Sequence, residues 1–323
     1  MTARGRGGTG LAAAEGYPER SIPLRGFQRR PTPRNLAVLA MAFLAVPRSL
    51  AALRRAHADV VVTGGGYMAG PVAVAGVLTR RPVVAMEADS HLGLANRIIA
   101  PFATRVALAW PLRKRAGKKY LVAGRPVRRS VLRATRTSGR RMFGIPPDAT
   151  VVLVVGGSQG ARSLNIAAVE AFGPEPPFHV IHVAGPTQVD DVRALLDGRQ
   201  SARYRLEAYL DDLPEALAAA DLVVSRSGGS VFELAAIGRP SILVPYPYAT
   251  ADHQTANARW LADAGAAVLL PDADCTGERL RALVGALLSD RRRLEAMAES
   301  ARAMGKPDAA DRIAEAVLEV ART

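Results

Sequence analysis

The sequence predicts an α/β fold made of two Rossmann-like, doubly wound domains in series. Short apolar runs rich in Val and Ile alternate with Ala- and Leu-rich helical patterns along most of the 323 residues. Most of the apolar runs end in glycine or in a polar turn, as parallel strands do at the ligand-binding edge of a sheet. The net charge of +14 is also divided unevenly along the chain.

In the first half, a helical segment over Pro33–Ala56 precedes the predicted strands. These strands are Asp59–Thr63, Pro82–Met86, Arg105–Trp110 and Lys119–Ala123. In the second half, the predicted strands are Thr150–Val155, His179–Ala184, Arg205–Leu210, Asp221–Ser225, Ser241–Pro245 and Ala267–Leu270, with helices such as Leu213–Ala220 and Val231–Ile237 between them.

We expect a first domain over residues 1–123 and a second over residues 124–307. The segment Gly124–Arg128 is the expected hinge, because proline and glycine punctuate it and the charge balance changes there. Residues 308–323 form an amphipathic helix that we expect to pack back on the first domain. A single cysteine, Cys275, excludes an internal disulfide and fits a reducing compartment.

The excess of positive charge lies entirely in the first domain. Residues 1–123 hold 19 Lys and Arg against 5 Asp and Glu, whereas residues 124–323 hold 24 of each sign. The charge suggests an anionic partner, and the basic, apolar segment Pro33–Ala56 could lie in a lipid headgroup layer or be a core helix with solvated arginines. The apolar run Leu36–Val46, which ends at Pro47, is too short to span a bilayer. Nucleic acid is not expected, because aromatics rarely interleave with the charges and no recognition motif is present.

Four loops at strand ends collect the unusual residues of the chain. They are TGGGYMAG from Thr63, GGSQGAR from Gly156, SRSGGSVFE from Ser225 and VPYPYATADHQTAN from Val244. Gly156, Gly157 and Gly160 predict a phosphate cradle at a helix start, although a strand-to-helix turn without ligand reads the same way. The loop is neither a Walker loop nor GxGxxG. Because such loops share one edge of a sheet, we expect them to face one cleft.

These stretches, with GLANR from Gly93, RPVR from Arg125 and YLDDL from Tyr209, resemble the GT-B glycosyltransferases and, within them, the MurG family. The resemblance covers nearly the whole chain and implies a GT-B fold. It also implies an inverting transfer of N-acetylglucosamine from UDP-GlcNAc to the C4 hydroxyl of the MurNAc sugar in lipid I, the lipid-linked muramyl-pentapeptide acceptor, which forms lipid II for peptidoglycan synthesis. The implied location is peripheral, at the cytoplasmic face of the cell membrane, on its anionic surface.

The resemblance also implies roles for individual residues. Ser158 and the amides of Gly156, Gly157 and Gly160 would hold the diphosphate. The other implied contacts are Asn165 bracing this loop, Arg128 and Leu210 at the uracil, Glu233 at the ribose hydroxyls, Gln254 and His253 at the sugar, and Tyr67 at the acceptor. Alone, Glu233 could equally be a solvated residue or a helix cap. Neither a cofactor nor a metal is expected, because no acidic cluster has metal-ligand spacing.

The chain departs from the family at its start and in one loop. Gly7–Gly10 spell GGTG, but no apolar strand precedes them and no histidine follows. We therefore expect the first strand, its GGTGGH loop and its helix to be absent, through a start codon placed too far downstream, a gene fragment or a degenerate paralogue. The general base is thus unknown. Glu87 and His91, in and beside MEAD where relatives have HEQN, are candidates, and His91 also reads as an ordinary loop residue.

These departures keep other functions open. The alternatives are a GT-B transferase of UDP-sugars acting on a glycolipid or small acceptor, and a non-catalytic UDP-sugar-binding paralogue. Loss of an interior strand would expose a sheet edge, so we expect the chain as written to be poorly stable and to turn over weakly.

Overall fold

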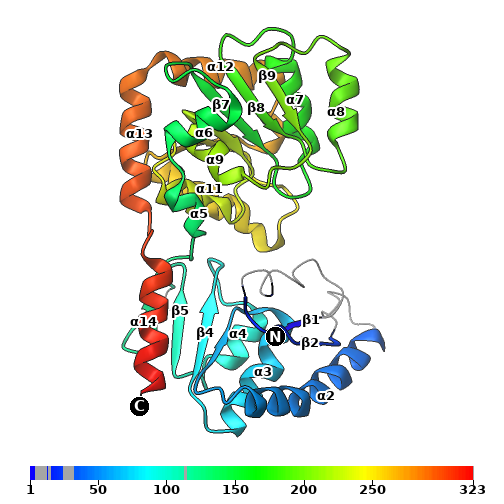
Figure 1. Cartoon of the computed structure of the whole chain (residues 1–323), viewed down its shortest axis with the longest axis vertical. Helices are drawn as coiled ribbons and strands as arrows, with labels where there is room; N and C mark the ends of the chain where they lie inside the picture. The colour runs from blue at the N-terminus through cyan, green and yellow to red at the C-terminus, as the bar shows by residue number, and fades with distance from the viewer. Residues whose placement is uncertain (4–12, 14–15, 25–32, 113–114, 323) are drawn as a thin grey trace. The chain divides into compact units, whose positions relative to one another are not determined.

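The computed structural model describes residues 1–3, 13, 16–24, 33–112 and 115–322. The chain divides into one compact unit formed by Met1–Arg125 with Asp308–Thr323 and a second formed by Pro126–Pro307 (Figure 1). Each is an α/β unit with parallel strands, as the sequence predicts. The expected GGTG loop at Gly7–Gly10 lies outside the described residues.

The second unit holds a six-stranded parallel sheet in the order β12-β11-β10-β7-β8-β9. Its strands are β7 (Val151–Val155), β8 (His179–Val183), β9 (Tyr204–Glu207), β10 (Leu222–Ser225), β11 (Ser241–Leu243) and β12 (Ala267–Leu269). The chain winds from β7 outward through β8 and β9, then crosses to β10 and winds the other way. All five residues of β7 are buried, as expected for a central strand covered on both faces.

Helices cover both faces of this sheet. They are α5 (Arg129–Arg133), α6 (Arg136–Phe143), α7 (Arg162–Phe172), α8 (Val189–Leu196), α9 (Leu213–Ala219), α10 (Ser230–Ala236), α11 (His253–Asp263), α12 (Gly277–Ser289) and α13 (Arg291–Met304). Short 3₁₀ turns lie at Thr250–Asp252 and Asp272–Asp274. Several strands end earlier than predicted: β9, for example, ends at Glu207 and β11 at Leu243, so Leu210 and Pro245 lie in the loops that follow.

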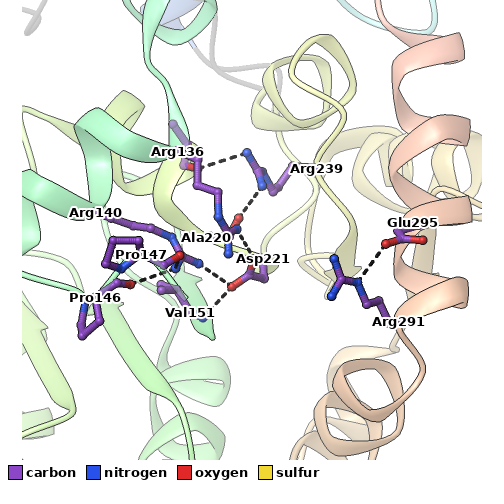
Figure 2. A network of polar contacts seen from close by, with 11 residues as sticks. Arg136, Arg140, Pro146, Pro147, Val151, Ala220, Asp221, Arg239, Arg291 and Glu295 are labelled. Atoms are coloured by element: carbon purple, nitrogen blue, oxygen red, sulfur yellow. Dashed lines mark hydrogen bonds and ion pairs between the residues drawn. The ribbon is translucent and has the colours of Figure 1, made fainter. Parts of the chain in front are cut away.

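Asp221 joins a helix to the amino ends of the two central strands (Figure 2). Its carboxylate accepts from the backbone N–H of Val151 at 2.8 Å and from Arg140 at 2.9 Å, and it also pairs with Arg136. Arg140 donates further to the carbonyls of Pro146 and Pro147. Burial lowers the pKa of the Arg140 guanidinium, and the Asp221 charge opposes that shift. This network fixes α6 to the sheet at the edge where β7 and β10 begin.

The first unit holds a four-stranded parallel sheet in the order β3-β4-β5-β6 and a separate pair of short strands, β1 and β2. The strands are β1 (Thr2–Ala3), β2 (Ser21–Ile22), β3 (Val61–Thr63), β4 (Val83–Glu87), β5 (Arg105–Leu108) and β6 (Tyr120–Val122). The helices are α2 (Pro33–Arg55), α3 (Gly66–Leu78), α4 (Leu94–Ile99) and α14 (Ala309–Ala321). Among the described residues, β3 is an edge strand, and Val62 is 44% exposed there.

The C-terminal helix α14 belongs to the first unit, although it follows the second in sequence (Figure 1). Ile313 packs with Ala107 of β5 and with Ala123 just after β6. Arg105 and Glu319 form an ion pair at 2.7 Å beside this contact.

The helix expected over Pro33–Ala56 is confirmed, and Pro47 does not interrupt it. Helix α2 continues through Pro47 to Arg55, and its buried residues Ala45, Ala52 and Leu53 lie on both sides of the proline. Packing therefore outweighs the backbone hydrogen bond that the proline cannot make. By length and composition alone, Leu36–Arg55 could cross a membrane. An 18-residue window of it has a mean hydropathy of 2.0, and 29% of that window is buried.

Candidate nucleotide-sugar site

A pocket of about 1100 Å³ opens at the carboxyl ends of β7 and β10 in the second unit. These strands are neighbours, with Val155 of β7 in register with Ser225 of β10, and the winding direction of the sheet reverses between them. Parallel sheets bind their ligands at such a switch point. The pocket is lined by these residues predicted from the sequence: Arg128, Gly156, Gly157, Ser158, Gly160, Leu210, Glu233 and Gln254.

The glycine turn after β7 is shaped by its own backbone. A Cβ on Gly156 would lie 2.4 Å from the Ala161 nitrogen, so only glycine lets the chain fold back so tightly. Gly157 and Gly160 have φ values of +90° and +79°, which glycine adopts readily. Helix α7 begins directly after this turn, and no side chain caps its first amides. The uncapped N–H groups and the helix dipole favour an anion such as phosphate at this position.

Arg128 and Glu233 meet at the side of the pocket. Arg128 Nε lies 3.3 Å from Glu233 Oε1. The Glu233 side chain is 18% exposed and the Arg128 side chain 57%, so the carboxylate is largely buried and its guanidinium partner lies on the solvent side. Glu233 lies in the first turn of α10, and its carboxylate could accept from two vicinal hydroxyls. The Arg128 contact satisfies part of that acceptor capacity.

The Gln254 side chain is oriented by a backbone contact. Its Oε1 accepts from the N–H of Tyr246 at 2.9 Å, which leaves the amide Nε2 as the donor that Gln254 can offer to the pocket it lines. Its backbone carbonyl accepts from Ser227 Oγ at 2.8 Å. Helix α11 is therefore fixed to the SRSGG loop by the residue that faces the pocket.

Three of the predicted substrate-binding residues are not among those that line this pocket. Asn165 is buried beneath the glycine turn, and its Nδ2 donates to Ala184 O at 2.9 Å. His253 begins α11 next to Gln254. Tyr67 lies in the first unit, where it packs on a small cluster that contains Ile22 and Ala45.

The two candidate bases lie in the first unit and differ in their surroundings. Glu87 is 7% exposed, and its carboxylate accepts from the N–H groups of Asp89 and Gly93 and from Asn96 Nδ2. Those contacts order the loop before α4 and favour a structural role for Glu87. His91 is exposed in the same loop.

Arg226 is a pocket residue for which the sequence predicts no role. Its guanidinium donates to the carbonyls of Val244 and Pro245, to Asp272 Oδ1 at 2.6 Å and to Ser163 Oγ at 2.9 Å. It therefore ties together the ends of β10 and β11, the turn after β12 and the start of α7. The SRSGG motif includes Arg226, but its hydrogen-bond partners lie in other segments of the chain. Its role could therefore not be predicted from the motif alone. Within the described part of the chain, no group of three or more His, Cys, Asp or Glu residues could hold a metal ion.

Comparison with known proteins identifies the family. The N-terminal domain of glycosyltransferase family 28 matches residues 2–108, and its C-terminal domain matches residues 151–313. The chain belongs to glycosyltransferase family 28. The two matches fall in both units, and the second includes every residue that lines the pocket except Arg128.

Named relatives lie within the MurG branch of this family. One, from Desulforudis audaxviator, is 40% identical over 97% of this chain and 87% of its own length. Another, from Nitratidesulfovibrio vulgaris strain Hildenborough, is 40% identical over 97% of this chain and 86% of its own. Both are named as N-acetylglucosamine transferases that use UDP-N-acetylglucosamine and an N-acetylmuramyl-(pentapeptide) pyrophosphoryl-undecaprenol. The crystal structure of MurG from Acinetobacter baumannii superposes with a TM-score of 0.73 at 28% identity, over 96% of this chain and 87% of that one. The predicted GT-B fold and family resemblance are thus confirmed.

Proposed function

We propose that this family 28 glycosyltransferase moves N-acetylglucosamine from UDP-GlcNAc to the C4 hydroxyl of the MurNAc sugar in lipid I and so forms lipid II. The single observation that carries the donor half is the pocket at the switch point, where an uncapped α7 N-terminus and Glu233 line the same cavity. The acceptor follows from the relatives, whose shared name specifies a lipid-linked muramyl-pentapeptide.

The pocket residues divide between the parts of UDP-GlcNAc. We place the diphosphate at Ser158 and the amides of the glycine turn, the ribose at Glu233, and the uracil near Arg128 and Leu210. Gln254 Nε2 would donate to the sugar, beside His253. Asn165 supports the turn from below. No metal takes part in this assignment.

The transfer itself is a direct displacement. The C4 oxygen of the acceptor forms a bond to the anomeric carbon while the bond from that carbon to the β-phosphate oxygen breaks, and the hydroxyl proton passes to a base. Inversion gives a β-1,4 linkage. Negative charge grows on the departing UDP, and the α7 N-terminus stabilises that charge where it develops. We assign no base among the described residues, because the Glu87 carboxylate already holds its loop together.

We place the acceptor and the membrane surface at the first unit. Leu94, Ile98 and Phe102 are 60–68% exposed on α4 and the turn after it, and Arg97 lies among them. Exposed apolar side chains beside positive charge are typical of surfaces that contact anionic lipid. The charge excess of residues 1–123 supports the same position, and Tyr67 is the acceptor contact that the family resemblance implies.

Replacement of Glu233 by alanine tests the ribose assignment. Hydrogen bonds to a charged group contribute about 1.5–3 kcal/mol, so Glu233→Ala should weaken UDP binding by about tenfold to a hundredfold in a calorimetric titration. The matched control is Glu278→Ala, which removes an exposed glutamate from the first turn of α12 and should leave the affinity unchanged.

A second titration separates ribose binding from general damage. Wild type should bind 2′-deoxy-UDP less tightly than UDP, and Glu233→Ala should bind both equally. Unchanged UDP affinity in Glu233→Ala, or a persistent preference for the ribose form, would remove Glu233 from the site.

A further inference from the structure

A line of hydrogen-bonded polar side chains crosses the core of the second unit and ends at the glycine turn. His182, the fourth of the five residues of β8, is fully buried, and its strand neighbours Val180, Ile181 and Val183 are apolar and buried. Its Nδ1 lies 2.6 Å from the Tyr204 hydroxyl of β9, and its Nε2 lies 3.0 Å from Asn165 Oδ1 of α7. Buried polar groups are costly unless satisfied, so an imidazole at this position requires an explanation.

The contacts of Asn165 determine where the protons lie. Its Nδ2 donates to Ala184 O at 2.9 Å and to Gln188 Oε1 at 3.0 Å, so its Oδ1 is the acceptor for His182. His182 Nε2 therefore carries the hydrogen, and Nδ1 accepts from the Tyr204 hydroxyl. Burial lowers the pKa of His182 to about 3 and raises that of Tyr204, so both are neutral near pH 7. Each side chain in the line has one defined orientation.

The far end of the line supports the backbone of the phosphate turn. Gln188 Nε2 and Thr187 Oγ1 both donate to the carbonyl of Gln159 at 3.2 Å. The turn also rests directly on the segment after β8, since a Cβ on Gly160 would lie 2.0 Å from Ala184 O. That oxygen is the one that Asn165 holds. A displacement of Asn165 would therefore pass to the turn through Ala184 and through Gln188.

We propose that His182 is a positioning residue for the diphosphate: by orienting Asn165 it fixes the segment after β8, and thereby the backbone amides of the Gly156–Gly160 turn. The inference rests on the proposed function of the pocket. It assigns His182 no contact with substrate. An apolar side chain could fill the same volume, but it could not orient the Asn165 amide. Small displacements of a binding group lower affinity steeply, so the loss should appear in phosphate binding and not in nucleoside binding.

Titrations of the full chain with UDP and with uridine test this inference. The ratio of the two affinities isolates what the diphosphate adds. His182→Asn places an amide near the position of Nδ1 and loses the Asn165 contact, whereas His182→Gln places its amide nitrogen near Nε2 and can still donate to Asn165. Gln188→Ala breaks the far end of the line at a partly exposed position and so avoids a buried substitution. Ile181→Val is the matched control, because Ile181 lies on the opposite face of β8 from His182 and the substitution still removes buried volume.

We expect His182→Asn and Gln188→Ala to weaken UDP binding about tenfold while uridine binding stays at the wild-type value. His182→Gln should recover most of the loss, and Ile181→Val should keep the wild-type ratio. Because Gln188 also lines the pocket, the decision rests on His182: a wild-type ratio in His182→Asn would overturn the positioning role, as would equal losses for UDP and uridine. If wild type itself bound UDP no more tightly than uridine, the phosphate assignment of the pocket would fail instead.

Discussion

Gly157 and Gly160 lie in the same turn of the pocket but meet different constraints. Both have positive φ, yet a Cβ on Gly157 would meet open space, whereas one on Gly160 would overlap the Ala184 carbonyl. Gly157→Ala should therefore cost only the backbone strain, about 1–2 kcal/mol of unfolding free energy. Gly160→Ala should cost about 3 kcal/mol or more, because the turn must move.

Urea denaturation of the two glycine variants measures this difference, and UDP titration measures its functional side. Gly160→Ala should also lose most UDP affinity, since the backbone amides of the displaced turn would no longer point at the phosphates. Equal destabilisation by the two substitutions would mean that the close approach to Ala184 does not limit the turn.

Helix α6 and strands β7 and β10 depend on Asp221, at the sheet edge opposite the pocket. Asp221→Ala leaves the buried Arg140 without its carboxylate and removes the acceptor for the Val151 N–H. Breaking a buried ion pair in this way costs about 3–5 kcal/mol, and urea denaturation should show that loss. The exposed pair Arg291–Glu295, also drawn in Figure 2, is the control, and Glu295→Ala should cost less than about 0.5 kcal/mol.

The Asp221 variant should bind UDP normally at temperatures where it remains folded, because the pocket lies at the carboxyl ends of the strands. A loss of UDP affinity matching the loss of stability would contradict this separation of the two edges.

The individual strands could be predicted from sequence because each carries its own local signal. Val151–Val155 is a continuous β-branched and leucine run, and the glycines after it mark the turn without reference to any other segment. The loops at strand ends followed from the same rule, whereas the roles of residues such as Arg128 and Leu210 came only from the family resemblance. The connections across the sheet could not be predicted, since His182 finds Asn165 and Tyr204 at separations of 17 and 22 residues.

At the scale of the whole molecule, the buried imidazole makes stability depend on pH. The pKa of His182 falls from 6.5 to about 3 on folding, so between these values the unfolded chain binds a proton that the folded chain does not. The free energy of unfolding should therefore decrease as the pH falls through this window, by up to about 1.4 kcal/mol per pH unit. His182→Gln removes the imidazole, so the unfolded variant does not take up this proton.

Urea denaturation of wild type and His182→Gln at about pH 7.5 and about pH 5.5 measures this dependence. Wild type should lose about 1 kcal/mol more than the variant on acidification. The pKa of His179 is also lowered by burial and by Arg203, but His179 is present in both proteins and cancels. The same pH dependence in both would show that His182 takes up a proton in the folded state.

The uneven charge of the chain predicts how the whole molecule binds lipid. With 19 Lys and Arg against 5 Asp and Glu in residues 1–123, binding to phosphatidylglycerol vesicles should exceed binding to phosphatidylcholine vesicles. It should fall when salt rises from about 0.1 M to about 0.5 M, since exposed charges are then screened.

Phe102, which is 68% exposed, should add an apolar contact, so Phe102→Ser should weaken vesicle binding about tenfold in a sedimentation assay. Leu195→Ser, at an apolar residue of α8 that is 46% exposed, should leave vesicle binding unchanged. Equal losses in the two variants would exclude the first unit as the specific lipid-binding surface, and binding that ignores lipid charge would exclude the electrostatic contribution.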